Sequence, residues 1–148
     1  MKINFKLFFI LVGLTVIFSS CRTSAPRLDY QALARASVLL GIDINLEDDH
    51  KLYLEAADWI GAPYRGGGDS KRGTDCSGMV YQIYRKVYRI QVPRNTEELK
   101  NKSNKVAKRN LKEGDLVFFS SNRSRKRVAH VGIYLKSGKF IHSSTSRG

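Results

Sequence analysis

The sequence predicts an α+β fold in which N-terminal helices pack on an antiparallel sheet. Apolar residues recur at helical spacing over residues 77–89, whereas 115–119, 130–135 and 139–144 read as strands separated by turns. Helices that precede a run of strands are typical of an α+β domain. With 148 residues, of which 42% are hydrophobic, the chain is long enough for one domain with a small core.

Residues 1–20 have the pattern of a bacterial signal peptide. Two lysines precede an uncharged, mostly apolar run over residues 7–18, which is short for a membrane span and suits a signal-peptide core. The segment ends in "IFSSC", which resembles a lipobox, so we expect lipidation of Cys21, which would become the mature N-terminus. Plain secretion and a membrane anchor are the alternatives.

Residues 21–44 are predicted to be a lipid-anchored tether that includes a weak helical segment at 31–40. A second helix is predicted over 45–61, because acidic residues cluster at its start and Gly61 can end it. Its apolar face would consist of Leu52, Ala56, Trp59 and Ile60. The glycine-rich stretch 62–74 is predicted to be a loop.

Cys76 lies at the predicted start of the helix over 77–89. Asp75 is a natural N-cap, and the free N–H groups and aligned dipoles of a helix start stabilise a thiolate. The position fits a nucleophile, and it equally fits a buried thiol that fills the helix start. Lipid on Cys21 would rule out a disulfide with Cys76, and a zinc site would need more ligands than Cys76 and three scattered histidines.

The turn at residues 136–138 decides whether two histidines share one face of the sheet. A two-residue loop would separate His130 from His142. A three-residue loop places His142 across from Gly132 and diagonal to His130, and it puts a glycine in the left-handed position that such loops need. Only the second register keeps the apolar residues together, so we expect the two histidines about 7–8 Å apart, Cβ to Cβ.

A thiol at a helix start and two histidines on one strand face are the parts of a nucleophile–base–orienter triad. In this interpretation Cys76 attacks, His130 takes its proton and His142 holds the imidazole in the productive tautomer. Each histidine could instead be a structural residue, and the residues alone leave both interpretations open. His50 lies in a charged helix start and is interpreted as a surface residue.

The chain is strongly basic, with 26 Lys and Arg against 13 Asp and Glu, a net charge of +13. Such a charge suits an anionic partner, or a solvated face that keeps the protein soluble. We expect no nucleic-acid partner, because no nucleic-acid motif accompanies the charge. The basic residues gather between 100 and 127: Lys100, Lys102, Lys105, Lys108, Arg109, Lys112, Arg123, Arg125, Lys126 and Arg127.

The motifs of the chain follow the order "GAPYRGGG…GTDCSGMVYQIY…VPRNT…LKEGDLVFF…AHVGIYL…KFIHSSTSRG". This order closely resembles NlpC-type (NlpC/p60) peptidoglycan cysteine peptidases, above all the lipoprotein endopeptidases of Gram-negative envelopes. The resemblance runs from about residue 52 to the end and implies a peptidase domain over 45–148 with a minimal papain-like fold. It also implies a monomer without metal or cofactor, lipid-anchored in the cell envelope, at the outer membrane facing the periplasm.

The resemblance implies hydrolysis of amide bonds in peptidoglycan stem peptides or cross-links by a Cys-His-His triad. Position by position, Cys76 matches the nucleophile, His130 the base and His142 the orienting residue. Tyr64 matches a tyrosine that helps stabilise the tetrahedral intermediate. The alternatives are a non-catalytic peptidoglycan-binding lipoprotein of the same fold, and an enzyme that transfers the acyl group to an amine.

Asp75 and Ser77 match positions that contact the stem peptide in relatives. Arg94 is expected to border the cleft, with a structural pairing to a helix end as the alternative. Gly66 and Leu99 replace an aromatic residue and a glutamine of the family pattern. Relatives continue through further strands, so the sheet is expected to be incomplete at its C-terminal side.

Overall fold

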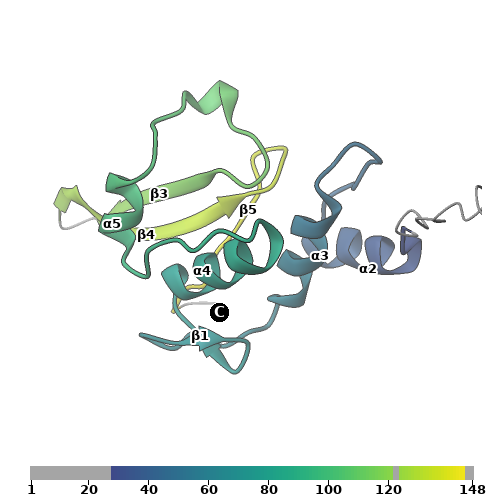
Figure 1. Ribbon diagram of the computed structural model, residues 1–148, viewed down its shortest axis with the longest axis horizontal. Coiled ribbons are helices and arrows are strands. Elements are labelled where there is room, and N and C mark those ends of the chain that lie inside the picture. Colours follow the sequence, from purple (N-terminus) through teal and green to yellow (C-terminus); the bar gives the residue numbers. More distant parts are fainter. Residues whose placement is uncertain (1–27, 122–123, 146–148) are drawn as a thin grey trace, which may run out of the picture.

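The computed structural model describes residues 28–121 and 124–145, where helices precede the main sheet (Figure 1). The helices are α2 (Tyr30–Leu40), α3 (His50–Asp58), α4 (Cys76–Val87) and α5 (Thr96–Asn101), with a 3-10 turn η1 (Lys108–Asn110). The strands are β1 (Asp69–Ser70), β2 (Gly73–Thr74), β3 (Leu116–Ser121), β4 (Ser124–Tyr134) and β5 (Phe140–Ile141). The predicted α+β fold is confirmed, while the predicted signal peptide and Cys21 lie outside the described residues.

Both N-terminal helices begin at aspartates that cap them. Asp29 accepts the Ala32 N–H at the start of α2, which confirms the helix expected at 31–40. Asp49 accepts the Leu52 N–H, so α3 begins at His50 and the prediction that this helix starts at 45 is wrong. The residues before it form a turn instead, because the Asp48 carboxylate accepts the Asn45 N–H.

The predicted apolar face of α3 is largely correct. Leu52, Ala56 and Trp59 are buried, whereas Ile60 lies beyond the end of the helix with 48% of its surface exposed. Ile60 was therefore wrongly assigned to the core. The reason is that helical spacing no longer applies once the helix ends at Asp58.

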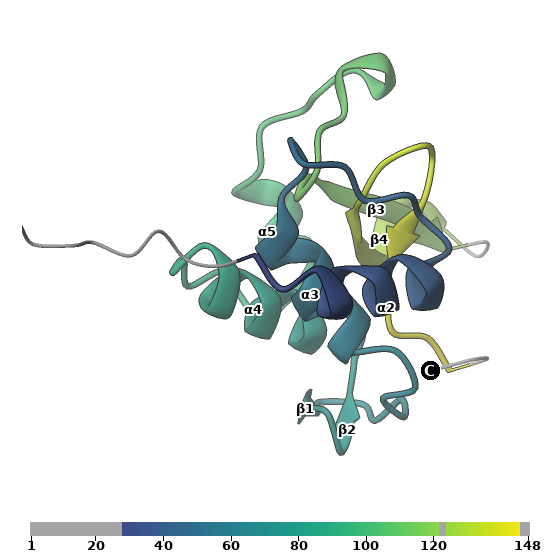
Figure 2. The same cartoon turned by 90° about the vertical axis from the view of Figure 1, so that its right-hand side faces the viewer.

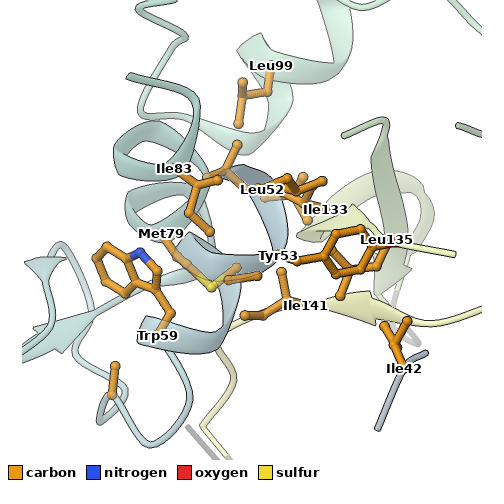
Figure 3. Packing of buried hydrophobic residues seen from close by; sticks show 14 residues of the cluster. Ile42, Leu52, Tyr53, Trp59, Met79, Ile83, Leu99, Ile133, Leu135 and Ile141 are labelled. Atoms are coloured by element: carbon orange, nitrogen blue, oxygen red, sulfur yellow. The ribbon is translucent and has the colours of Figure 1, made fainter. Parts of the chain in front are cut away.

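Helix α4 buries Met79, Val80 and Ile83, as its spacing predicts. These side chains meet Val131 and Ile133 of β4 in the main core cluster, which α3 completes from the other side. Figure 3 shows Met79 and Ile83 pointing toward the residues that α3 and the sheet contribute. Figure 2 shows α2, α3 and α4 between the larger sheet and the β1–β2 hairpin.

The stretch 62–74, predicted to be a loop, contains the antiparallel β1–β2 hairpin. Two glycines permit this compact arrangement. A Cβ on Gly68 would lie only 2.3 Å from the Gly73 carbonyl oxygen, and Gly73 itself has a φ of +157°. The hairpin could not be read from the sequence because its strands are two residues long and have no apolar alternation.

The main sheet is antiparallel in the order β3–β4–β5. The Leu135 N–H donates to the Lys139 carbonyl over 2.9 Å, and Gly138 has a φ of +78°. The three-residue loop is therefore confirmed. Strand β5 is shorter than the predicted 139–144, because the chain leaves the ladder after Ile141 and runs toward the start of α4.

Candidate active site

Cys76 is the first residue of α4 and is a half-buried free thiol. The preceding Asp75 caps the helix, and its carboxylate accepts the Gly78 N–H over 2.7 Å. Both features are as predicted. The thiol therefore lies at the positive end of a twelve-residue helix dipole, where a thiolate is stabilised.

His130 and His142 form a hydrogen-bonded pair. Nε2 of His130 and Nδ1 of His142 lie 2.7 Å apart, with the two rings nearly perpendicular. Gly132 makes this approach possible, because a Cβ there would lie 3.3 Å from the His142 Cβ and 2.7 Å from the Ile141 carbonyl oxygen. The predicted shared face is confirmed. Since Nε2 of His130 faces His142, Nδ1 of His130 is the nitrogen left to meet a nucleophile.

Partial burial lowers the pKa of His130 below its ordinary value. Partial burial, together with the charge that His130 would carry, also lowers the pKa of His142. Both rings are therefore neutral at pH 7. A neutral pair can share one proton, with one nitrogen donating and the other accepting, and a neutral imidazole can accept the proton of a thiol.

Hydrogen bonds between residues near Cys76 and residues near the histidines connect the two parts of the site. In the described part of the chain, the Cys76 sulfur has its hydrogen bond with the Thr96 hydroxyl, 3.8 Å away, and none with an imidazole. The Ser143 hydroxyl, next to His142, donates to the Thr74 carbonyl over 3.0 Å. The segment that follows β5 is thereby hydrogen-bonded to Thr74, two residues before Cys76.

Helix α5 provides a second connection. Its first residue, Thr96, meets the sulfur, and its second, Glu97, accepts the Val128 N–H of β4 over 3.1 Å. Val128 lies two residues before His130 on that strand. The helix therefore spans the distance between the thiol and the histidine strand. Sequence reasoning missed Thr96, Glu97 and Ser143, because their role depends on contacts between distant segments.

Asp75, Ser77 and Arg94 form one polar cluster at the start of α4. Arg94 pairs with the Asp75 carboxylate over 3.0 Å, and the Ser77 hydroxyl donates to the Arg94 carbonyl over 2.6 Å. Arg94 also donates to the Gly68 carbonyl over 3.0 Å. This geometry matches the structural alternative for Arg94, a pairing with a helix end. The three residues hold the glycine-rich segment against the helix, and their contact with a substrate stays a prediction.

Burial opposes ionisation of Asp75, but hydrogen bonds from Arg94, Gly78, Gly67 and Ser77 outweigh it and lower the pKa of the carboxyl. Asp75 is therefore ionised throughout the neutral range. An ionised cap at this position fixes the orientation of the first turn of α4. The same carboxylate thus serves as N-cap and as partner of the arginine.

Tyr64 is partly exposed, and its backbone forms a bridge with Thr74, two residues before Cys76. Its neighbour Arg65 donates its N–H to the Thr74 carbonyl over 2.8 Å. These contacts place the backbone of Tyr64 next to the segment that leads into α4. At Gly66, a Cβ would meet no atom within 4 Å, so the position where relatives carry an aromatic residue is open.

Two aromatic side chains that the sequence did not single out accompany the histidines. The ring of Phe119 lies 6.0 Å from His130, and the ring of Phe140 lies 5.2 Å from His142. The two phenylalanines also contact each other at 5.1 Å and are partly exposed. They provide an apolar wall beside the imidazoles.

The described residues contain no group of three or more His, Cys, Asp or Glu side chains arranged to hold a metal ion. Among the helices of residues 28–121 and 124–145, none has the length and apolar character needed to span a bilayer.

The histidine pair predicts a dependence of stability on pH. The folded protein binds protons at His130 and His142 more weakly than the unfolded chain, whose histidines titrate near 6.5. The contribution of these two histidines to stability is therefore fully present above about pH 6.5 and is lost as the pH falls below that value. We expect the melting temperature to fall between pH 7.5 and 5 and to fall less in His142→Asn. Asp75 does not interfere, since its contribution is lost only below about pH 4. An equal fall of the melting temperature with pH in the native chain and in His142→Asn would contradict this account.

A cysteine at a helix start, packed beside an antiparallel sheet that carries paired histidines, defines an α+β domain of the papain-like class. The sequence model described as the NlpC/P60 family matches residues 61–148. The chain belongs to the NlpC/P60 family. The prediction from the motifs is thereby confirmed.

Two curated relatives illustrate the similarity. The chain is 32% identical to a "Probable endopeptidase NlpC homolog" of Haemophilus influenzae, over 97% of this chain and 87% of that protein. It is 38% identical to "Murein DD-endopeptidase MepS/Murein LD-carboxypeptidase" of Escherichia coli, over 70% of this chain and 54% of that protein. The chain thus spans most of the first relative and about half of the second.

Solved structures agree with the fold. The NlpC/p60 domain of the peptidoglycan hydrolase SagA superposes with a TM-score of 0.58 at 30% identity, covering 70% of this chain and 85% of that one. An NlpC/P60 family protein of Bacillus cereus superposes with a TM-score of 0.61 at 32% identity, covering 71% of this chain and 34% of that one. The α+β architecture is therefore shared with known NlpC/P60 domains.

Proposed function

We propose that the chain is a cell-wall (murein) endopeptidase that hydrolyses amide bonds in peptidoglycan stem peptides or cross-links. The observation that carries the proposal is the His130–His142 pair, 2.7 Å apart, on a sheet fastened to the helix that begins at Cys76. Relatives named as murein endopeptidases and as a peptidoglycan hydrolase support the choice of substrate.

In the proposed mechanism, the Cys76 sulfur gives its proton to Nδ1 of His130 and attacks the carbonyl carbon of an amide. The N–H of Cys76 and the Tyr64 hydroxyl stabilise the oxyanion. The C–N bond then breaks, and His130 donates the proton to the leaving amine. A water gives a proton to His130, its oxygen attacks the thioester, and the C–S bond breaks as His130 returns the proton to the sulfur, which regenerates the thiol. His142 orients His130 throughout.

Before the attack, the sulfur has to turn from Thr96 toward His130. Catalytic hydrogen bonds are often long or poorly aligned in substrate-free enzymes and tighten when substrate binds. The stem peptide would lie against the apolar wall of Phe119 and Phe140 and reach the Asp75–Arg94 cluster at the helix start. We propose Asp75, Ser77 and Arg94 as substrate-binding residues on this basis.

The proposed setting is the cell envelope. Lipid on Cys21 would hold the mature chain as a monomer at a membrane, with the outer membrane facing the periplasm as the proposed location. The net charge of +13 suits the anionic polymers of the wall. The alternative is a non-catalytic peptidoglycan-binding lipoprotein. One observation supports it: the sulfur contacts Thr96 and not an imidazole.

One experiment separates the two functions. The purified chain is incubated with isolated muropeptides, and the products are identified by mass spectrometry. We expect fragments whose masses correspond to cleavage of a stem or cross-link amide and that disappear after alkylation of the thiol. Binding of sacculi without any new fragments would reject the enzyme and support the binding protein.

The Thr96 contact predicts the reactivity of the nucleophile. Replacing Thr96 with valine keeps the shape of the side chain but removes the hydroxyl from the Cys76 sulfur. We expect alkylation of Cys76 by iodoacetamide to slow by about 2–10-fold, the value of one partly exposed hydrogen bond. Thr96→Ser retains the hydroxyl and should react like the native chain. An unchanged rate in Thr96→Val would show that the contact does not influence the thiol.

A further inference from the structure

The outward face of α2 is unusually apolar for a solvent-facing helix surface. Val38 is 82% exposed, Tyr30 69% and Leu39 55%, whereas Leu33 and Ala36 on the opposite side are buried. The remaining outward positions of the helix are Gln31, Ala34 and Arg35. This face therefore combines large apolar side chains with an arginine and carries no carboxylate.

The apolar face extends beyond the helix. Leu28 precedes α2 and is exposed, and Leu46, in the turn before α3, is 70% exposed. Leu28, Leu46, Tyr30 and Ala34 line one shallow groove, so they are neighbours on the surface. Two acidic side chains lie beside these residues: Glu47 lines the same groove, and Asp29 caps the helix. We call the set Leu28, Tyr30, Val38, Leu39 and Leu46 the α2 patch.

The position of the α2 patch along the chain restricts what can cover it. Leu28 follows Cys21 by seven residues, which span at most about 25 Å when fully extended. A lipid on Cys21 would therefore keep Leu28, two residues before α2, within that distance of the bilayer. Figure 1 shows α2 at the edge of the domain opposite α5, where the described chain begins. A short tether gives the patch a high effective concentration at the membrane surface.

The chemistry of the patch suits the boundary between headgroups and acyl chains. Tyrosine is enriched at that depth, aliphatic side chains enter the acyl region, and arginine pairs with phosphate. Around the helix Arg35 lies between Val38 and Leu39, so its long side chain has to extend along the apolar face for its guanidinium to reach the headgroups while Val38 and Leu39 point into the bilayer. The tether itself contributes two further arginines, Arg22 and Arg27.

We infer that the α2 patch docks on the phospholipid bilayer to which the chain is anchored. The inference rests on the proposed lipidation of Cys21, and it is independent of the proposed cleavage of murein. Docking through α2 would restrict the rotation of the domain about its tether and would fix how far the histidine pair lies from the membrane. The occupant is the lipid surface, not a second protein.

The test uses the full chain, lipidated in a bacterial membrane and reconstituted in vesicles of phosphatidylethanolamine and phosphatidylglycerol. Val38→Trp places a fluorescent probe in the patch, and its exposure leaves room for the ring. Val106→Trp, on the exposed loop before η1, is the matched control, and the native chain supplies the background of the buried Trp59. Vesicles with brominated acyl chains quench only probes at acyl depth.

We expect the emission of Val38→Trp to shift to the blue and to lose more than half its intensity in brominated vesicles. Val106→Trp and the native chain should change little. Equal quenching of both variants, or none, overturns the inference. A blue shift of Val38→Trp that depends on protein concentration and not on bromine identifies a second copy as the occupant and also overturns it.

The same samples separate this inference from the proposed function. The mass of the N-terminal peptide reports whether Cys21 carries lipid, and an unmodified Cys21 overturns the inference at its premise. Digestion of muropeptides by the same preparation tests the enzyme. Cleavage without quenching rejects only the docking, and quenching without cleavage rejects only the endopeptidase.

Discussion

Replacing Cys76 with alanine is expected to abolish the cleavage of muropeptides, with a loss of about 10⁴-fold or more in rate. Alanine removes the sulfur that forms the acyl-enzyme and leaves only binding and oxyanion stabilisation. The fold should survive, because Cys76 is half-buried at the edge of the core and alanine favours helix. The measurement is the initial rate of fragment formation, followed by mass spectrometry, with the melting temperature recorded for each protein.

Histidine variants provide the matched controls. His130→Ala should lose as much activity as Cys76→Ala, and the double variant should lose little more, because residues that act as a unit are not additive. His50→Ala removes a histidine whose ring bonds to the Asn45 carbonyl, away from the paired imidazoles. Its activity should stay near that of the native chain. Activity in Cys76→Ala, or an equal loss in His50→Ala, would contradict the assigned triad.

The register of β4 and β5 was predictable because local chemistry and burial agree. Gly138 accepts the left-handed position of the turn, and Val131, Ile133 and Ile141 can be buried together in only one of the two registers. That register brings His130 beside His142. The cap of α4 was predictable for a similar reason, since an aspartate before an amphipathic run satisfies free N–H groups.

The predictions from sequence were wrong where several residues could serve equally well as a helix cap, or where contacts between distant segments determine the structure. Asp48 and Asp49 are both suitable caps, and contacts of Glu113 with the Asp49 N–H and the Tyr53 hydroxyl help to select Asp49. These bonds join residues about sixty positions apart. Pattern reasoning cannot see such contacts, so it placed the start of α3 too early.

In the candidate site, too, features set by local patterns were predictable and features set by distant contacts were not. Cys76 and the histidines could be identified from local patterns. The contact between Cys76 and Thr96 could not, because it requires the path of the chain between α4 and α5. The pairing of Arg94 with Asp75 was weighed only as an alternative to a position at the cleft. Sequence therefore predicts where the candidate residues lie on the helix and the sheet better than it predicts the contacts that position them.

Gly78 is a position in this site where a single added methyl group should have a large effect on stability. A Cβ there would lie 2.2 Å from the Gly68 carbonyl oxygen, 2.7 Å from the Arg94 guanidinium and 2.9 Å from the Thr74 hydroxyl. The nearest of these atoms belongs to backbone, which cannot move aside like a flexible side chain. Alanine should therefore push α4 away from the glycine-rich segment and break the cluster around Asp75.

We expect Gly78→Ala to lower the free energy of unfolding by about 2 kcal/mol or more, the usual cost of forcing atoms into a packed site. The loss would occur although alanine gains about 1 kcal/mol in helix propensity over glycine. Urea denaturation measures the change. Because the start of α4 carries Cys76, the rate of muropeptide cleavage should fall as well, by roughly tenfold or more for a displacement near 1 Å.

Gly66→Ala is the matched control, since a Cβ at that exposed glycine meets no atom within 4 Å. Its free energy of unfolding should stay within about 0.5 kcal/mol of the native value. A Gly78→Ala protein as stable as Gly66→Ala would mean that the glycine-rich segment is not packed against α4. The connection that Arg94 and Asp75 make between that segment and the helix start would then have to be abandoned, together with the placement of the Tyr64 backbone next to the segment that leads into α4.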